Sequence, residues 1–329
     1  MSSTPQPTLE ADGPATDAAL SESAWRTSDP PGLGRVLARL VAFPRTILQH
    51  QDLVRSSVRR ELEARFTGTL LGWLWPLVFP IFTFAVYYFI FAELLQVKFG
   101  ERIADNPELK AAMGVYMFVG IVVWTGFAEG VNRSTTVITE NGNLIKKLAF
   151  PTELLPLNQV LSNLVTMMFG IVAFMLTVFA TNAVFDVGLW PNPPLAPLLW
   201  IPALVVLQGL FTYGLGLFLA TLHVFVRDTA QVIGILITVW MFITPLFWAP
   251  ELLPPEEVAK YIDALQVNPM YHLVFVWRNV LMGGIPAEAF VEGDAVGHSV
   301  LLFSAWAIGV FVVGYIFFAL SQRRFADEV

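Results

Sequence analysis

Residues 154–185 read LLPLNQVLSNLVTMMFGIVAFMLTVFATNAVF, a stretch without a single acidic or basic side chain. A helix needs about 20 consecutive apolar residues to cross the hydrocarbon core of a bilayer. Similar charge-free stretches recur along the chain. We place membrane crossings at residues 69–92, 112–134, 158–181, 197–224, 229–250 and 299–320. The sequence therefore predicts an all-α, polytopic membrane protein with six transmembrane helices.

The composition agrees with a membrane protein. Hydrophobic residues make up 56% of the chain and charged residues 14%, whereas a soluble domain carries about a quarter charged residues. The chain has no cysteine, which excludes disulfides and thiolate metal sites. The four histidines have no i, i+4 pairing, and we predict no metal site.

The distribution of basic residues predicts the orientation. With the N-terminus placed in the cytoplasm, most of the 19 Lys and Arg residues fall in cytoplasmic segments, as membrane proteins prefer. Both termini then lie inside. Residues 1–32 are acidic and rich in Pro, Ser, Thr and Ala, which predicts a disordered tail without signal-peptide features. The six-span membrane domain is expected to cover residues 67–323, and residues 324–329 to form a cytoplasmic tail.

Residues 33–66 predict an amphipathic cytoplasmic helix at the membrane interface. Its apolar residues recur at every fourth position and share one face: Val54, Val58, Leu62 and Phe66. Its functional polar residues are Arg55, Arg59, Arg60, Glu61 and Arg65. Glu61 and Arg65 are spaced to pair, and Pro44 predicts a break in the helix. The helix is either a simple membrane anchor or a docking helix for a cytoplasmic partner.

Residues 60–76, RELEARFTGTLLGWLWP, combine an Arg-Glu pair, an Arg-aromatic pair and Leu-Gly-x-x-Trp before a proline. This stretch resembles the opening of polysaccharide-exporting ABC permeases, which serve O-antigen, capsule and teichoic acid export. Weaker matches follow in the family's order at residues 141–151 (NGNLIKKLAFP) and at Asn268-Pro269-Met270 with Arg278 and Gly283-Gly284. The resemblance covers about residues 50–323.

The resemblance implies a transport subunit and not an enzyme. It implies a homodimer with two copies of a nucleotide-binding ATPase subunit in the bacterial plasma (inner) membrane. ATP and magnesium would bind the partner subunit, because this chain has no G-x-x-x-x-G-K-[ST] phosphate loop and needs no cofactor. The implied substrate is a lipid-linked polysaccharide. Membrane lipids are the remaining partner, and no nucleic acid is expected.

The cytoplasmic segment 140–152 is the predicted contact with the ATPase. Its coupling residues are Asn141, Leu144, Lys146, Lys147, Leu148, Phe150 and Pro151, and the turn Arg227-Asp228 adds a minimal, mostly structural contact. Gly142 is expected to end the second crossing in a left-handed cap, and Asp228 to cap the fifth. Without the resemblance, an ordinary basic cytoplasmic loop is the simpler interpretation of segment 140–152.

Charged and aromatic residues predict a gate and a channel. Glu129 and Arg133 lie four residues apart near the inner end of the second crossing, where charges pair or face a cavity. A mutual ion pair is the simpler reading, and a gating contact with the ATPase or the N-terminal helix is the alternative. The proposed channel residues are Trp73, Trp75, Phe79, Tyr87, Tyr88 and Trp124, although such aromatics also form interfacial belts.

The outer segment 251–298 is expected to form a re-entrant region before the last crossing. Its apolar part, residues 270–282, is too short to span. Asn268, Pro269 and Arg278 are assigned to the exit.

Two other functions compete with polysaccharide export. A related drug or small-lipid exporter fits the same architecture. A membrane glycosyl- or acyltransferase would need a polar catalytic cluster, and its only candidates, Glu129, Arg133, His223 and Asp228, form no recognised motif. A proton-coupled transporter would show mid-span acidic residues and an internal repeat, and we find neither.

Overall fold

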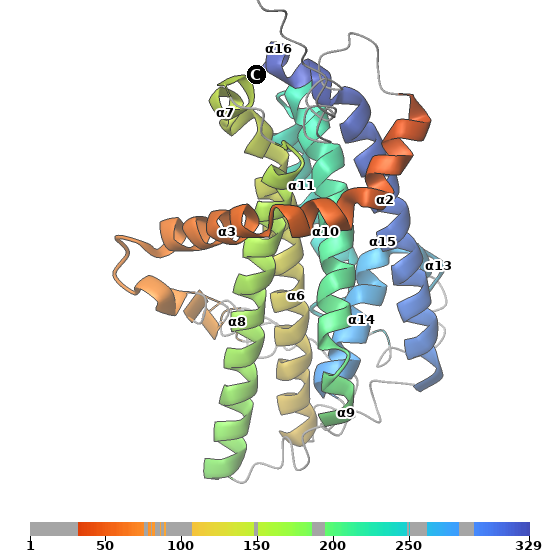
Figure 1. The fold of residues 1–329 in the computed structure, drawn as a ribbon. Helices are drawn as coiled ribbons and strands as arrows, with labels where there is room; N and C mark the ends of the chain where they lie inside the picture. Colours follow the sequence, from red (N-terminus) through yellow and green to blue (C-terminus); the bar gives the residue numbers. More distant parts are fainter. Residues whose placement is uncertain are drawn as a thin grey trace, which may run out of the picture.

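The computed structural model describes residues 32–75, 78–79, 81–82, 86, 89, 107–147, 151–185, 195–248, 250, 262–282 and 293–329. Every regular element within these ranges is a helix. Four long helices run side by side (Figure 1): α6 (Pro107–Glu140), α8 (Leu154–Phe185), α10 (Ile201–Phe225) and α15 (Gly293–Ser321). All four are long and apolar enough to cross a membrane. They match four of the six predicted crossings, and the total of six stays a prediction.

The remaining elements are shorter. They are α2 (Leu33–Gln49), α3 (Gln51–Phe66), η1 (Gly72–Leu74), α7 (Gly142–Lys147), α9 (Leu195–Leu198), α11 (Thr229–Ile243), α13 (Ile262–Val267), α14 (Pro269–Met282), η4 (Gln322–Arg324) and α16 (Phe325–Glu328). The predicted first crossing, 69–92, is only partly covered by the described residues, which thin out to pairs and single positions after residue 75.

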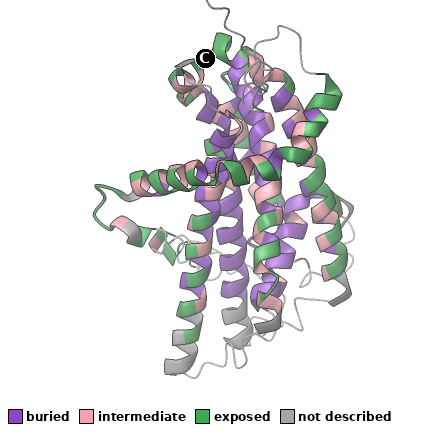
Figure 2. Ribbon diagram, viewed as in Figure 1, coloured by how far each residue is buried: buried purple, intermediate pink, exposed green. Residues whose placement is uncertain are grey.

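Helix α6 forms the centre of the bundle. It packs against α8, α10 and α14, and α10 packs in turn against α15. Figure 2 shows that α6 is buried along most of its described length, whereas α8 and α15 expose one side. Large apolar residues occupy these exposed sides, among them Phe169, Leu176, Leu301 and Val313. Such continuous apolar surfaces suit contact with lipid better than contact with water.

The N-terminal interface segment consists of two helices, and the expected break at Pro44 is wrong. Pro44 lies inside α2, and the chain leaves the helix at His50, where φ is −109° and ψ is 21°. Tertiary packing explains the continuity, because Phe43, next to the proline, is buried between α10 and α15. Its ring stacks on Tyr213 at 5.5 Å and meets Tyr315 edge-on at 5.5 Å. Packing of this kind outweighs a local helix penalty.

Helix α11 is shorter than the predicted crossing at 229–250. It has 15 residues and ends at Ile243, which gives a length of about 22 Å. A hydrocarbon core is about 30 Å thick. Residues 244–248 follow as non-helical chain, so their carbonyl groups need partners outside the α11 hydrogen-bond ladder.

Helices α10 and α15 touch backbone to backbone at a glycine pair. A Cβ atom on Gly314 would collide with the carbonyl oxygen of Gly214, and a Cβ atom on Gly214 would collide with the backbone of Phe311. Small residues at helix crossings allow this close approach in membrane proteins.

We expect Gly314→Ala to lower the free energy of unfolding by about 1–3 kcal/mol, because the new methyl group forces the two backbones apart. The matched control is Gly309→Ala on the same helix, where a Cβ atom meets nothing within 4 Å. Its effect should be neutral or a gain of up to about 1 kcal/mol, as alanine favours helix. Thermal unfolding in detergent measures both, and equal midpoints for the two variants would contradict the close contact.

Candidate functional site

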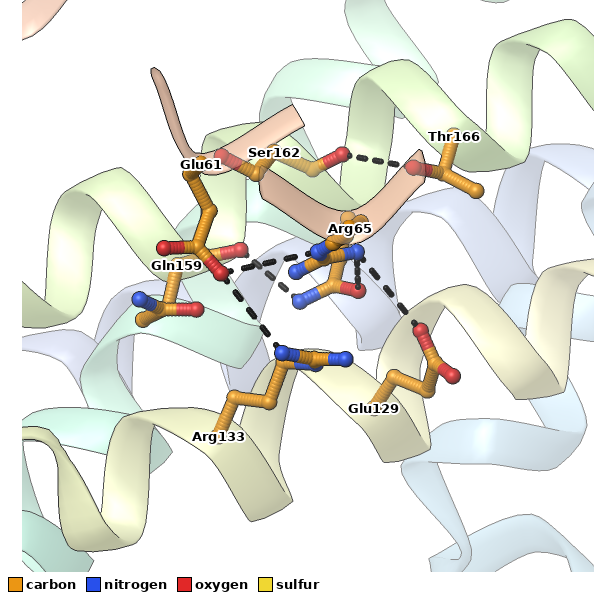
Figure 3. A network of polar contacts seen from close by, with 8 residues as sticks. Glu61, Arg65, Glu129, Arg133, Gln159, Ser162 and Thr166 are labelled. Atoms are coloured by element: carbon orange, nitrogen blue, oxygen red, sulfur yellow. Dashed lines mark hydrogen bonds and ion pairs between the residues drawn. The ribbon is translucent and has the colours of Figure 1, made fainter. Parts of the chain in front are cut away.

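A cluster of charged side chains joins α3 to α6 and α8 (Figure 3). Arg65 on α3 lies at its centre. Its Nη1 donates to Asn163 Oδ1 of α8 at 3.0 Å and lies 3.8 Å from a carboxylate oxygen of Glu129 on α6. Arg65 Nε lies 3.5 Å from Glu61 on the same helix, as the spacing predicted. We call Glu61, Arg65, Glu129, Arg133 and Asn163 the crossing cluster.

The expected ion pair between Glu129 and Arg133 is wrong. No such pair occurs among the ion pairs of the described residues, although both side chains are described. Arg133 Nη1 instead lies 3.5 Å from Glu61. The four charged groups contact one another in the order Glu129, Arg65, Glu61, Arg133, and their signs alternate. Two side chains of α3 therefore lie between the two side chains of α6. The contact with the N-terminal helix is thus the observed one, and its use as a gate stays a prediction.

Arg65 is far less exposed than its neighbours. Its side chain is 9% exposed, compared with 44% for Arg133 and 45% for Glu129. Burial, and then the nearby charge of Arg133, lower the pKa of Arg65. Arg65 Nε and Nη2, Gln159 Oε1 and Ser162 Oγ have no hydrogen-bond partner within the described structure. Unsatisfied buried polar groups are costly, so the cluster has spare hydrogen-bonding capacity where α3 crosses the bundle.

The connection after α6 differs from its predicted geometry. The left-handed cap at Gly142 is wrong, because the described glycines with positive φ are Gly68 and Gly72 alone. Asn141 makes the turn instead: its Nδ2 donates to Val137 O at 2.8 Å, and its own carbonyl accepts from Leu144 and Ile145. Gly142 therefore begins α7.

Only part of the predicted coupling residues can be located. Leu144 is half-buried against the core, Lys146 is exposed and Pro151 is half-buried. Leu148, Phe150 and the side chain of Lys147 lie outside the described residues.

The turn between α10 and α11 also corrects an expectation. Asp228 precedes α11, but its side chain makes no capping hydrogen bond. Its backbone is helical, with φ −71° and ψ −11°, whereas a capping residue is normally extended. Thr229 Oγ1 donates to Val226 O at 2.6 Å in this turn. Arg227 Nη2 donates to the carbonyl of Glu328 at 3.2 Å.

Asn268, assigned to the exit, fastens α14 to α11. Its Oδ1 accepts from Met270 N at 3.0 Å and from Trp240 Nε1 at 2.9 Å. Its Nδ2 donates to Thr244 Oγ1 at 3.1 Å. Pro269 occupies the first position of α14, where a missing N–H costs nothing. Asn268 and Pro269 thus start α14 at a defined place.

Arg278 holds the non-helical segment after α11. It is 3% exposed, and it donates to Tyr116 O at 3.1 Å, Pro245 O at 2.7 Å and Leu246 O at 3.1 Å. Its guanidinium also lies 3.3 Å from the centroid of the Tyr116 ring. Arg278 therefore supplies donors to the carbonyls released where α11 stops and joins them to α6 and α14.

Gln208 is a core residue that sequence reasoning missed. Its Nε2 donates to Val123 O at 3.2 Å and to Met167 Sδ at 3.3 Å, and its Oε1 accepts from Trp277 Nε1 at 2.9 Å. It thereby links α10 to α6, α8 and α14. The available signal was a lone amide within an apolar crossing, because such groups bond to neighbouring helices.

The predicted channel aromatics are only partly described. Trp124 is buried in the core, with its ring 5.5 Å from Phe127 and 6.0 Å from Trp240, centroid to centroid. Trp75 and Phe79 are exposed. The side chains of Trp73, Tyr87 and Tyr88 lie outside the described residues. The structure gives Trp124 a packing role, and the channel role stays a prediction for all six.

We expect Arg278→Met to destabilise the protein by about 3 kcal/mol or more, because it leaves the carbonyls of Pro245 and Leu246 without their arginine donor and also removes the contact with α6. Arg278→Lys should lose less, since an ammonium keeps the charge but not the fork of donors. Arg59→Met is the control: that side chain is 78% exposed, and its loss should cost at most about 1 kcal/mol. If unfolding in detergent gives Arg278→Met the same midpoint as the control, the contacts of Arg278 do not stabilise the protein.

A double-mutant cycle distinguishes the two pairings of Arg133. The cycle of Glu61→Gln and Arg133→Gln should give a coupling energy of about 0.5–1 kcal/mol in unfolding experiments. The cycle of Glu129→Gln and Arg133→Gln should give a coupling near zero. The reverse result would support an ion pair between Glu129 and Arg133 on α6.

Comparison with known proteins adds a family match. The model of a family described as ABC-2 type transporter matches residues 52–282. The chain is 28% identical over 241 residues to the O-antigen export system permease protein RfbA of Myxococcus xanthus, covering 73% of this chain and 84% of that one. A protein of the same name from Klebsiella pneumoniae is 26% identical over 276 residues, covering 84% and 94%. The family match includes both the crossing cluster and Arg278.

Proposed function

Because this chain belongs to the ABC-2 type transporter family as a membrane permease, we propose that it exports a lipid-linked polysaccharide across the bacterial inner membrane. Permeases of this family generally pair with an ATPase subunit. In the proposal, two copies of the chain form the passage, and two ATPase subunits supply the energy from ATP and magnesium. The substrate moves from the cytoplasm to the outer side.

The proposed substrate is based on the similar proteins. The name of each relative refers to O-antigen export, and the match to one Klebsiella pneumoniae protein covers 94% of its length. Residues 60–76, which resemble the opening of polysaccharide-exporting permeases, support the same substrate. The proposed substrate class is therefore a long sugar polymer on a lipid carrier.

The proposed orientation places α7 and the Arg227-Asp228 turn in the cytoplasm. Figure 1 shows α7 and α9 at opposite ends of the bundle, which agrees with one crossing per long helix. Arg133 lies seven residues before the end of α6 at Glu140, or about 10 Å along the helix. Helix α3 would then lie at the inner membrane interface, as proposed for an interface helix.

The crossing cluster is the proposed place where ATPase motion reaches the membrane. A push on segment 140–152 would act on α6 and α8, which that segment connects. Helix α3 is tied to both by Arg65, so it would follow their relative movement. Charged contacts with spare donors can exchange partners, unlike the close glycine contact between α10 and α15. Opening would therefore occur beside α3, with the exposed Trp75 and Phe79 available to the sugar chain.

The test is a pull-down of the tagged chain in mild detergent, with an assay for bound ATPase. We expect a stoichiometric ATPase that is lost in Leu148→Asp and Phe150→Asp, because a buried charge would disrupt the apolar contact, while membrane insertion stays intact. The control is Leu199→Asp at the opposite end of the bundle, where Leu199 is 81% exposed.

Two results would contradict the proposal. A preparation without any ATPase would contradict the proposal of an ABC exporter. Unchanged ATPase capture by both Leu148→Asp and Phe150→Asp would contradict the proposed coupling contact. For the substrate, reconstituted complex should hydrolyse ATP faster with lipid-linked polysaccharide than with small lipids or drugs. The opposite preference would favour the other exporter class.

A further inference from the structure

Residues 322–329 contact both described cytoplasmic connections of the bundle. This segment, which we call the clasp, comprises η4, α16 and Val329. Helix α16 packs against α7 and α10, and Figure 1 shows it beside α7 at the same end of the molecule. The clasp therefore bridges elements that are far apart in the sequence.

The clasp reaches both ends of segment 140–152. At one end, Gln322 Nε2 donates to Thr152 Oγ1 at 2.7 Å and to Glu153 Oε2 at 3.1 Å, just before α8. At the other end, Val329 lies against Gly142, where an added Cβ atom would be 3.3 Å from Val329 Cβ. The carbonyl of Glu328 accepts from Arg227 Nη2 at 3.2 Å, which adds the second connection.

A single aromatic side chain anchors the clasp to the bundle. Phe325 is fully buried, and its ring meets Phe318 of α15 edge-on at 5.1 Å. Arg324, Ala326, Asp327 and Glu328 are exposed. The clasp thus has one face fixed to the bundle and another open to the cytoplasmic side of the proposed orientation.

Helix α7 needs an external support of this kind. It has six residues, and helices this short are not stable on their own. Its orientation must come from contacts with the rest of the protein, and α16 provides one of them. A partner that binds α7 also meets the exposed face of the clasp, because the two are packed together.

We propose that the clasp is part of the docking surface for the ATPase subunit and holds α7 and the Arg227-Asp228 turn as one rigid unit. This inference rests on the proposed function and deepens it. The ATPase would then receive a composite surface from three separate parts of the chain, with the exposed Lys146, Arg324 and Asp327 as its polar contacts.

The first test is Phe325→Ala, which removes the anchor, in the full chain purified with its ATPase. We expect capture of the ATPase to fall about fivefold or more, because without its anchor the clasp is no longer held in position for docking, while membrane insertion is unchanged. Leu320→Ala is the control, because it removes a large apolar side chain close to Phe325 in the sequence that is 40% exposed. Phe325→Leu should keep wild-type capture.

A disulfide tests the rigid unit without removing any packing. The chain has no cysteine, so Gly142→Cys with Val329→Cys forms the only possible intramolecular pair, at a spacing near that of natural disulfides. We expect oxidation to link the pair and leave ATPase capture and ATP-driven export within about twofold of the reduced form, since rigid parts tolerate a link.

Three results would overturn the inference. They are equal ATPase capture by Phe325→Ala and Leu320→Ala, failure of the two cysteines to link, and a linked form whose export is lost and returns on reduction. If the wild-type chain captures no ATPase, the proposed function fails as well, whereas capture by wild type with unchanged capture by Phe325→Ala removes the clasp alone.

Discussion

A bilayer core offers no hydrogen-bond partners, so each backbone group that leaves a helix must find one within the protein. This constraint decides how the bundle is built where α11 stops early. Arg278 supplies the donors for Pro245 and Leu246, and Asn268 fixes the start of α14 beside them. The position of α14 against α6 and α15 follows from these contacts. A buried arginine is costly in a membrane, and here its charge is spread over carbonyls and an aromatic ring.

The bundle combines rigid and exchangeable contacts. Gly214 and Gly314 fix α10 to α15 through backbone contact, and Gln208 links four helices through buried hydrogen bonds. The attachment of α3 is mixed, because it combines apolar packing by Val54 and Leu62 with ion pairs around Arg65 whose partners are partly exposed. Packed interfaces move as units, while ion pairs at a surface rearrange at low cost. The opening proposed beside α3 rests on this difference between the contacts.

The sequence predicted the helices that are determined by composition. Charge-free stretches located α6, α8, α10 and α15, and i, i+4 spacing located the pair of Glu61 and Arg65. The two largest misses depend on residues distant in the sequence, whereas the missing caps at Gly142 and Asp228 reflect local turn geometry. Pro44 stays within α2 because Phe43 packs on Tyr213, and Arg133 pairs with Glu61 because α3 crosses α6. Hydrophobicity alone likewise did not show that α11 ends at Ile243, since apolar residues resume at Leu246; Pro245 was the available stop signal.

The docking of α2 has a consequence for biogenesis. Phe43 is made early, but two of its ring partners, Phe311 and Tyr315, belong to α15 near the other end of the sequence. During synthesis α10 can cover part of the apolar face of α2 through Tyr213, but the contacts with α15 form only after that helix is inserted. Exposed apolar surface of this kind attracts chaperones and promotes aggregation. The final docking of α2 therefore reports that the whole bundle has been assembled, and chains stalled before α15 remain distinguishable to the cell's quality control.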